Sequence, residues 1–548
     1  MALHPATLPA PRAARWALLA APLAFLAVVF VWPTAALLWR GFVGSGGQVI
    51  GQDILGTAST WRAVGTTVGL ASAGTALAVA LGVPLAWALF RMRWRGQGAV
   101  RALASVPFVL PTVVVAVAFS ALLRPTGLLG ALGADQSLGA IVGALAFFNL
   151  SVVMRVVGGT WAGLDPRPAI AARTLGASPW RAFRGVTLPS LIPAIAAAAS
   201  VVFLFCASSF AIVLVLGGTR VNSVETEIWI QVNQFLDLRA ASTLAILQIA
   251  IVALALGAAE WARSRRDRVA SGAVADGTRP ASHADALGIA AALAGPALLI
   301  GLPLAGLVER SLRTADGWGL AHYAALLRQP PRSVLPVPLW QAAVNSLEAA
   351  TAAAALAMVA GLALAYALAR SRRARWAGAL AMLPLGVSSV IVGLGVLLTL
   401  ARPLPWGLGV PSPAILIPVA QAVVAFPLVV RSLVPALTSI RPEIRASAAV
   451  LGASPSRVWR TVEWPLVRRP VGLALGFAFA VSLGEFGATN FLARPDHPTL
   501  PTAIFRYLGR PGIDNVGTAF AASVVLAAMT GAIMMMAERL RTGREGEV

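Results

Sequence analysis

The sequence predicts an all-α polytopic membrane protein, with about twelve transmembrane helices arranged as two parallel six-helix repeats. Composition is the first observation: 58% of the 548 residues are hydrophobic and 12% are charged, whereas a soluble domain carries about 25% charged residues. The mean hydropathy is +0.80. The second observation is a series of apolar segments of bilayer length, and the third is a repeat that relates the two halves of the chain.

Twelve apolar segments are each long enough to cross about 30 Å of hydrocarbon as a helix. The first six run roughly over 16–39, 64–90, 102–123, 139–157, 191–216 and 240–262. The second six run roughly over 286–309, 341–369, 377–401, 413–431, 470–493 and 516–537. The first segment is too long for the apolar part of a signal peptide, and no small-residue cleavage site follows it, so we expect an uncleaved anchor.

The basic residues predict the orientation. All 43 of them are arginines. With the N-terminus in the cytoplasm, 30 of the 43 lie in or beside cytoplasmic segments, as the positive-inside rule requires. The sequence therefore predicts a multi-pass protein of the bacterial cell membrane with both termini in the cytoplasm.

An internal repeat divides the chain. "LGASPWRAFRGVTLP" (Leu175–Pro189) aligns without a gap with "LGASPSRVWRTVEWP" (Leu451–Pro465), and "VPLAWALFR" (83–91) matches "LALAYALAR" (362–370). The repeat predicts two halves, 1–262 and 286–548, joined by a flexible cytoplasmic linker over 263–285, which is polar and rich in Ser, Ala, Gly and Arg. Because six spans is an even number, the halves run parallel, related by an axis along the membrane normal.

The repeat is strongest in two cytoplasmic loops, at about 158–190 and 432–469. In the first loop, Asp165-Pro166 can start a short helix and Gly176 can end it. Ser178-Pro179 can start a second helix, and Pro189 marks the beginning of the next span. The pattern predicts a helix, a glycine turn and a second helix on the cytoplasmic face, repeated in the second half.

These loops resemble the "EAA" loop of the MetI-like, binding-protein-dependent ABC importer permeases. In that family a glycine is followed by nine residues and then by a hydrophobic residue, any residue, Leu and Pro. Gly176 is followed by nine residues and "VTLP", and Gly452 by nine and "VEWP". The head of the motif differs, since Ile-Ala-Ala (170–172) and Ala-Ser-Ala (446–448) both lack its glutamate.

The resemblance implies that each loop is a coupling helix that docks on a separate ATPase subunit. It implies a fused permease that pairs with two ATPase copies and one extracytoplasmic binding protein, with ATP-Mg held by the ATPase and no cofactor on this chain. The coupling residues carried over are Ala171, Ala172, Gly176, Ala177, Pro179, Pro189, Ser447, Ala448, Gly452, Ala453, Pro455 and Pro465. The alternative for these loops is an amphipathic connector drawn to lipid headgroups by its arginines.

Fused permeases of this layout resemble the thiamine and iron(III) importer branch. The segment 208–248, with its Gly-Gly and "VETEIW", looks most like the thiamine permeases. The expected cargo is thiamine or its phosphate esters, with iron(III) as the alternative.

Acidic residues within the predicted spans are few, and each is a functional hypothesis. Glu485 lies deep in the span at 470–493, where it could face a wet pathway and a cationic cargo or make a structural hydrogen bond or ion pair. Its repeat counterpart is Ser209, and the neighbouring aromatic pair is Phe210 and Phe486. These four residues are the candidates for the translocation path.

Other classes of function fit less well. Without lysine, the chain has neither a Walker A loop nor a Schiff-base nucleophile. One cysteine, Cys206, and four scattered histidines give no metal-ligand spacing, and the arginines lie between apolar spans rather than on a polar surface for nucleic acid. A secondary transporter is the alternative class, since parallel six-helix repeats also occur there. An ion channel would leave the repeated loop unexplained.

Overall fold

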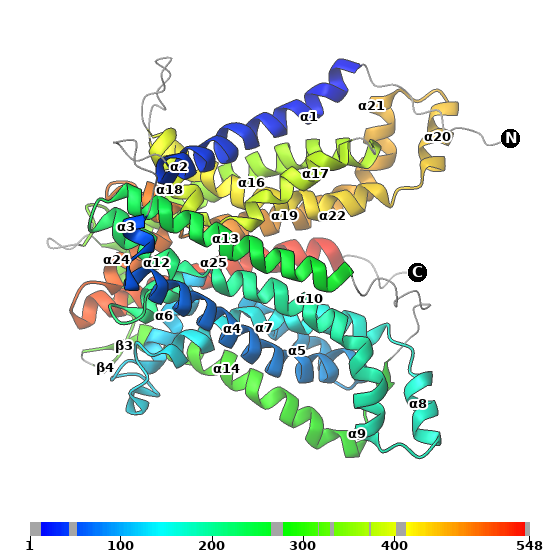
Figure 1. Ribbon diagram of the computed structural model, residues 1–548, viewed down its shortest axis with the longest axis horizontal. Helices are drawn as coiled ribbons and strands as arrows, with labels where there is room; N and C mark the ends of the chain where they lie inside the picture. The colour runs from blue at the N-terminus through cyan, green and yellow to red at the C-terminus, as the bar shows by residue number, and fades with distance from the viewer. Residues whose placement is uncertain are drawn as a thin grey trace. The chain divides into compact units, whose positions relative to one another are not determined.

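The computed structural model describes residues 12–42, 52–264, 278–315, 317–328, 334–371, 374–401 and 413–542. Within these ranges the chain is built of helices, with two pairs of two-residue strands (Figure 1). It divides into two compact units, which are treated separately below. Unit 1 comprises Met1–Arg40, Ala325–Arg506 and Val525–Val548, and unit 2 comprises Gly41–Ala324 and Tyr507–Val524.

Unit 2 holds most of the first repeat. Its helical elements are α3 (Gln52–Leu55), α4 (Ala58–Ala86), η2 (Trp87–Arg91), α5 (Gln97–Leu103), η3 (Val106–Phe108), α6 (Thr112–Leu123), η4 (Gly130–Leu132), α7 (Leu138–Ala162), α8 (Arg167–Thr174), α9 (Pro179–Ala182), η5 (Phe183–Thr187), α10 (Leu188–Ala207), α11 (Phe210–Gly217), α12 (Val224–Asn233), α13 (Leu238–Ser264), η6 (His283–Asp285) and α14 (Ala286–Leu312). Strand β1 (Met92–Arg93) pairs in parallel with β2 (Arg279–Pro280), and β3 (Arg313–Thr314) pairs antiparallel with β4 (Gly317–Trp318).

Unit 1 holds most of the second repeat. Its helical elements are α1 (Arg12–Leu26), η1 (Ala27–Val31), α2 (Trp32–Phe42), α16 (Leu339–Arg370), α17 (Arg375–Met382), η8 (Leu383–Gly386), α18 (Ser389–Thr399), η9 (Pro413–Ile415), α19 (Leu416–Thr438), α20 (Pro442–Val450), α21 (Pro455–Val458), η10 (Trp459–Glu463), α22 (Trp464–Leu483) and α23 (Thr489–Leu492). Four helices contain a unit boundary: α2, which continues from unit 1 into unit 2 after Arg40, α15 (Ala321–Leu327), α24 (Leu500–Leu508) and α25 (Ile513–Thr542).

The packing units do not coincide with the sequence halves at their first helices. In unit 1, α1 packs against α16, and the ring centroids of Phe25 and Phe426 lie 6.2 Å apart. In unit 2, α14 packs against α4 and α6, where a Cβ on Gly306 would lie 3.4 Å from Cα of Leu122. The first helix of each repeat therefore belongs to the unit built mainly from the other repeat.

The predicted number of spans agrees with the structure. Among the described residues, ten helices are long and apolar enough to cross a membrane, and two bent helix pairs raise the number to as many as twelve. The chain is thus an all-α polytopic membrane protein of two repeats. The predicted spans over 102–123 and 377–401 are the bent pairs, with bends of 100° and 98°, so their continuity was wrongly predicted.

Local chemistry explains the two bends. Pro111 lies between η3 and α6, and a residue that precedes proline is disfavoured in the α conformation. In the second repeat, Val387 and Ser388 are extended, and the Ser388 hydroxyl accepts the N–H of Val390 at 3.1 Å, which starts α18. A hydropathy pattern alone shows neither bend, because the helices on both sides of each bend are apolar.

The repeats share the close approach of their central helices. A Cβ on Gly82 of α4 would lie 2.7 Å from Cβ of Val153 on α7, and one on Gly361 of α16 would lie 2.6 Å from a methyl carbon of Val429 on α19. Glycine lets two helices approach this closely in a membrane, where packing drives association.

The last residues of the predicted linker pair with another loop. Residues 265–277 lie outside the described residues. Beyond them, β2 adds a parallel strand beside β1, and Ala281 N–H donates to the Arg93 carbonyl at 3.0 Å. The end of the 263–285 segment is therefore fixed to the loop that follows α4 and η2, although the sequence predicted a flexible connection.

Candidate functional site

The first repeated loop turns at Gly176. Helix α8 ends there, with Gly176 at φ +88°. The N–H of Ala177 donates to the Ala172 carbonyl at 3.0 Å, and that of Gly176 to the Arg173 carbonyl at 3.1 Å. These two bonds form a Schellman turn, which glycine enters without a steric penalty.

The second loop repeats this geometry. Gly452 has φ +80°, Ala453 N–H donates to the Ala448 carbonyl at 3.0 Å, and Gly452 N–H donates to the Ala449 carbonyl at 3.0 Å. The carbonyls of Ala171 and Ser447 accept the N–H groups of Leu175 and Leu451, both at 3.1 Å. The head positions and the glycine of each motif are thus parts of one turn.

A second helical segment follows each turn at a capped start. The hydroxyls of Ser178 and Ser454 accept the N–H groups of Arg181 and Arg457 at 3.3 and 3.4 Å. Pro179 and Pro455 lie just after these caps, where a missing N–H is harmless.

The expectation of a separate second loop helix is wrong. The helices run without a break from Pro179 to Ala207 and from Pro455 to Leu483. Each contains a π-helical turn, η5 or η10, just before Pro189 or Pro465. The wider turn accommodates a proline that cannot donate its backbone bond, so the spans predicted over 191–216 and 470–493 begin earlier, in the loops themselves.

The loop tips present apolar side chains. Leu175 is 88% exposed, and its counterpart Leu451 is 87% exposed. Ile170 and Trp180 are exposed on the first loop, and Val450 on the second. Helices α8 and α20 bury no residue within their units. An apolar tip on an otherwise basic loop is typical of a surface that meets a partner.

Beneath the second loop lies an ionic cluster that sequence reasoning missed. Glu463 is fully buried, and its Oε1 accepts hydrogen bonds from Arg370 Nη2 and Arg445 Nε, both at 2.5 Å. The Arg370 guanidinium lies 3.6 Å from the ring centroid of Tyr366. The cluster joins the end of α16 to α20 and η10, and so fixes the second loop to the membrane-spanning part of unit 1.

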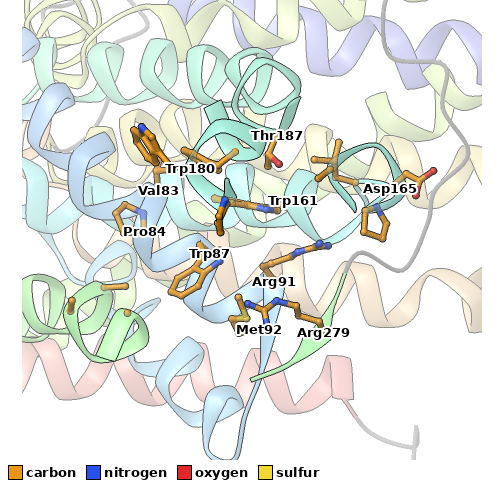
Figure 2. A pocket seen from close by; sticks show the side chains of 18 residues that line it. Val83, Pro84, Trp87, Arg91, Met92, Trp161, Asp165, Trp180, Thr187 and Arg279 are labelled. Atoms are coloured by element: carbon orange, nitrogen blue, oxygen red, sulfur yellow. The ribbon is translucent and has the colours of Figure 1, made fainter. Parts of the chain in front are cut away.

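The equivalent place beneath the first loop is a cavity of about 710 Å³ (Figure 2). Thr187 occupies the position of Glu463, and Ala169 that of Arg445, while Trp87 and Arg91 correspond to Tyr366 and Arg370. At these positions the first repeat has the smaller, uncharged side chains of Thr187 and Ala169 in place of the ionic pair. The sequence signal for this difference is the pair Thr187 and Glu463, which differ at one position of an otherwise well-preserved repeat.

The candidate path residues lie where two spans break. Helix α10 ends at Ala207 and α11 begins at Phe210, while α22 ends at Leu483 and α23 begins at Thr489. Ser209 N–H donates to the Cys206 carbonyl, and Glu485 N–H donates to the Ser482 carbonyl, both at 3.2 Å. The two repeats therefore share this backbone turn.

Glu485 is a helix cap in this geometry. It is 7% exposed, and its carboxylate accepts the N–H groups of Ala488 at 2.8 Å and Thr489 at 3.0 Å. The Thr489 hydroxyl also donates to it, at 2.6 Å. Anionic caps are stabilising at a helix N-terminus, so the structural role that the sequence left open is present.

The other three candidates are buried or partly buried. Phe486 packs edge-to-face on Phe505, with ring centroids 5.5 Å apart, and Phe210 is 4% exposed. The Ser209 hydroxyl is buried and makes no hydrogen bond with the described part of the chain. Their place in a translocation path stays a prediction.

Comparison with known proteins agrees with this architecture. Residues 78–266 match the family described as binding-protein-dependent transport system inner membrane component. The chain is 27% identical to the thiamine transport system permease protein ThiP of Brucella abortus, over 95% of each chain, and 26% identical to ThiP of Escherichia coli, over 82% of this chain and 84% of the relative.

A shorter relative matches one part of the chain more closely. The molybdenum transport system permease protein ModB of Azotobacter vinelandii is 33% identical over 30% of this chain and 76% of its own length. The ten to twelve candidate spans among the described residues fit a multi-pass protein of the inner membrane. The chain belongs to the family of inner membrane components of binding-protein-dependent transport systems.

Proposed function

We propose that this permease forms the translocation path of an ATP-driven importer, and that its cargo is thiamine or a thiamine phosphate ester. Two copies of a separate ATPase subunit bind the two repeated loops and hydrolyse ATP-Mg, and one extracytoplasmic binding protein delivers the cargo. This chain itself binds no cofactor.

The observation that carries the proposal is the matched pair of loop tips. Each tip combines a Schellman turn at a glycine with a leucine that is nearly nine-tenths exposed. Burying a leucine on a partner contributes about 1.5–3 kcal/mol. Two equivalent tips suit two copies of one partner. The coupling residues named from the sequence belong to these turns and the helix starts that follow them, except Pro189 and Pro465, which lie beyond the π turns.

The choice of cargo rests on the relatives that align along most of the chain. Those at 82–95% coverage are named as thiamine permeases, whereas the molybdenum permease aligns with only 30% of this chain. Iron(III) is the alternative cargo, and a secondary transporter is the alternative class.

A direct uptake measurement tests this function. In cells without thiamine uptake of their own, the chain co-expressed with its ATPase and binding protein should accumulate labelled thiamine. A catalytically dead ATPase should abolish the accumulation. Uptake of iron(III) instead of thiamine would identify iron(III) as the cargo. Thiamine uptake that continues with the inactive ATPase would indicate a secondary transporter.

We infer from the arginine asymmetry that both termini and the interdomain linker lie in the cytoplasm. In a Cys206→Ala background, a cysteine at exposed Ala284 should react with a membrane-impermeant maleimide only after the cells are permeabilised. A cysteine at exposed Ala131, in the loop between α6 and α7, should react in intact cells. The reverse pattern would invert the topology.

We propose that Glu485 also attracts a cationic cargo where the eleventh span breaks. Glu485→Gln keeps one oxygen acceptor but removes the charge, an attraction of about 1–4 kcal/mol at 4 Å. We expect thiamine uptake to fall several-fold while assembly with the ATPase is kept, whereas Glu485→Ala should also lower expression because it removes the cap of α23. Unchanged thiamine and iron(III) uptake in the Gln variant would leave Glu485 a purely structural residue.

A further inference from the structure

The cavity beneath the first loop has the features of a ligand site. Its volume of about 710 Å³ lies in the range of small-molecule pockets, about 300–1,000 Å³. One wall comes from membrane-spanning helices and is apolar, with Val83, Pro84 and Ala292. Aromatic rings form another wall, with Trp161 and Trp180 (Figure 2). The Phe183 ring stacks on both of them, with ring centroids 6.1 and 5.6 Å apart.

The polar edge of the cavity is mainly basic. Arg91 and Arg279 line it, together with one carboxylate, Asp165. Arg279 is held by Asp285, whose two oxygens accept from its Nη1 and Nη2 at 2.9 and 2.7 Å. This pair uses two of the five N–H donors of a guanidinium, so Arg279 is positioned and keeps further donors.

These charges lie where the spans end. Arg91 closes the helix Ala58–Arg91, and Arg279 lies just before the helix His283–Leu312. The cavity thus changes from apolar to basic near the ends of two candidate spans, and tryptophans such as Trp87, Trp161 and Trp180 are enriched where spans meet the membrane–water interface. Basic pockets between spans on the cytoplasmic side are typical sites for anionic headgroups.

The second repeat has a carboxylate beneath its loop. There, the Glu463 carboxylate accepts from two guanidiniums beneath the loop. We propose that the cavity of the first repeat binds the phosphate of an anionic phospholipid beside Arg91 and Arg279, with the glycerol backbone of the lipid against the aromatic wall. The lipid then braces the first loop as Glu463 braces the second.

Lipid cross-linking on the assembled complex tests this directly. The permease–ATPase complex is placed in nanodiscs that contain photoactivatable phosphatidylglycerol or photoactivatable phosphatidylcholine, and the adducts are mapped by peptide mass spectrometry. We expect phosphatidylglycerol adducts on the peptides of Trp87 and Trp180, about five- to thirtyfold above phosphatidylcholine, since each guanidinium favours an anionic headgroup by about fivefold. Because both leaflets have the same composition, this result does not depend on the orientation or on transport.

Two variants remove the site in different ways. Thr187→Glu places a carboxylate where the phosphate would lie, and Ala169→Arg with Thr187→Glu copies the ionic cluster of the second repeat without a change in net charge. Either should lower the pocket adducts at least about fivefold. Thr461→Glu is the matched control, since it adds the same charge at an exposed position of η10 and should leave the adducts unchanged.

Each outcome decides the proposal. Equal labelling by the two lipids, or pocket adducts that survive both variants, would overturn it. Displacement of phosphatidylglycerol by soluble phenyl phosphate would overturn the lipid assignment and indicate a site for a soluble phosphate ester. Should the double variant fail to assemble, the single Thr187→Glu variant with its Thr461→Glu control still gives the answer.

Discussion

Replacing Gly176 or Gly452 with valine should uncouple transport from ATP hydrolysis. Both glycines have positive φ, +88° and +80°, a conformation that costs other residues about 1–2 kcal/mol and is worst for β-branched side chains. A turn that opens displaces the exposed Leu175 or Leu451. Because the docked loop must keep this turn, the cost lowers the affinity for the ATPase, and each variant should bind it about five- to thirtyfold more weakly. With two independent loops, the double variant should bind on the order of a hundredfold more weakly.

Binding of the purified ATPase to the reconstituted permease, measured with uptake, checks this expectation. The matched control is Gly185→Thr, since Gly185 has open space around its Cα and the repeat carries Thr461 at the same position. The control should bind and transport normally. If both valine variants bind the ATPase as the wild type does, these turns are not part of the docking surface.

Replacing Glu463 with glutamine should lower both stability and transport. The change leaves Arg370 and Arg445 without the carboxylate that accepts from both at 2.5 Å. The two guanidiniums left behind are 35% and 22% exposed, so the cost stays below the about 3–5 kcal/mol of a fully buried ion pair. We expect a lower melting temperature and a second loop that is no longer held to the end of α16.

The control for Glu463→Gln is the same substitution at a carboxylate that is not buried. Glu443→Gln removes an exposed carboxylate from the first turn of the same loop helix, α20, and should cost only about 0.3–1 kcal/mol. Thermal unfolding in detergent, followed by uptake in vesicles, separates the two variants. Equal melting temperatures would mean that water reaches the cluster and that Glu463 does not brace the loop.

The loops were the most predictable part of the site because their information is local. A glycine at a helix end, a serine before a proline and a proline in the first turn define their own conformations through backbone sterics and capping. The Schellman turns at Gly176 and Gly452 therefore follow from a few adjacent residues. The continuity of the helix Pro179–Ala207 does not follow from adjacent residues. A proline at position 189 predicts a helix boundary, whereas the π turn over Phe183–Thr187 lets the helix continue through it.

Contiguous residues carry the information for the membrane class, the number of apolar segments, the repeat and the two turned loops, because hydropathy, periodicity and turn chemistry are local properties. Contacts between distant residues show that α1 packs with the second repeat and α14 with the first, and that two spans bend by about 100°. They also show that Glu463 joins two arginines beneath the second loop, whereas a cavity lies beneath the first. The physical reason is that apolar spans present similar surfaces to lipid and to one another, so their partners are selected by close packing between residues far apart in the chain.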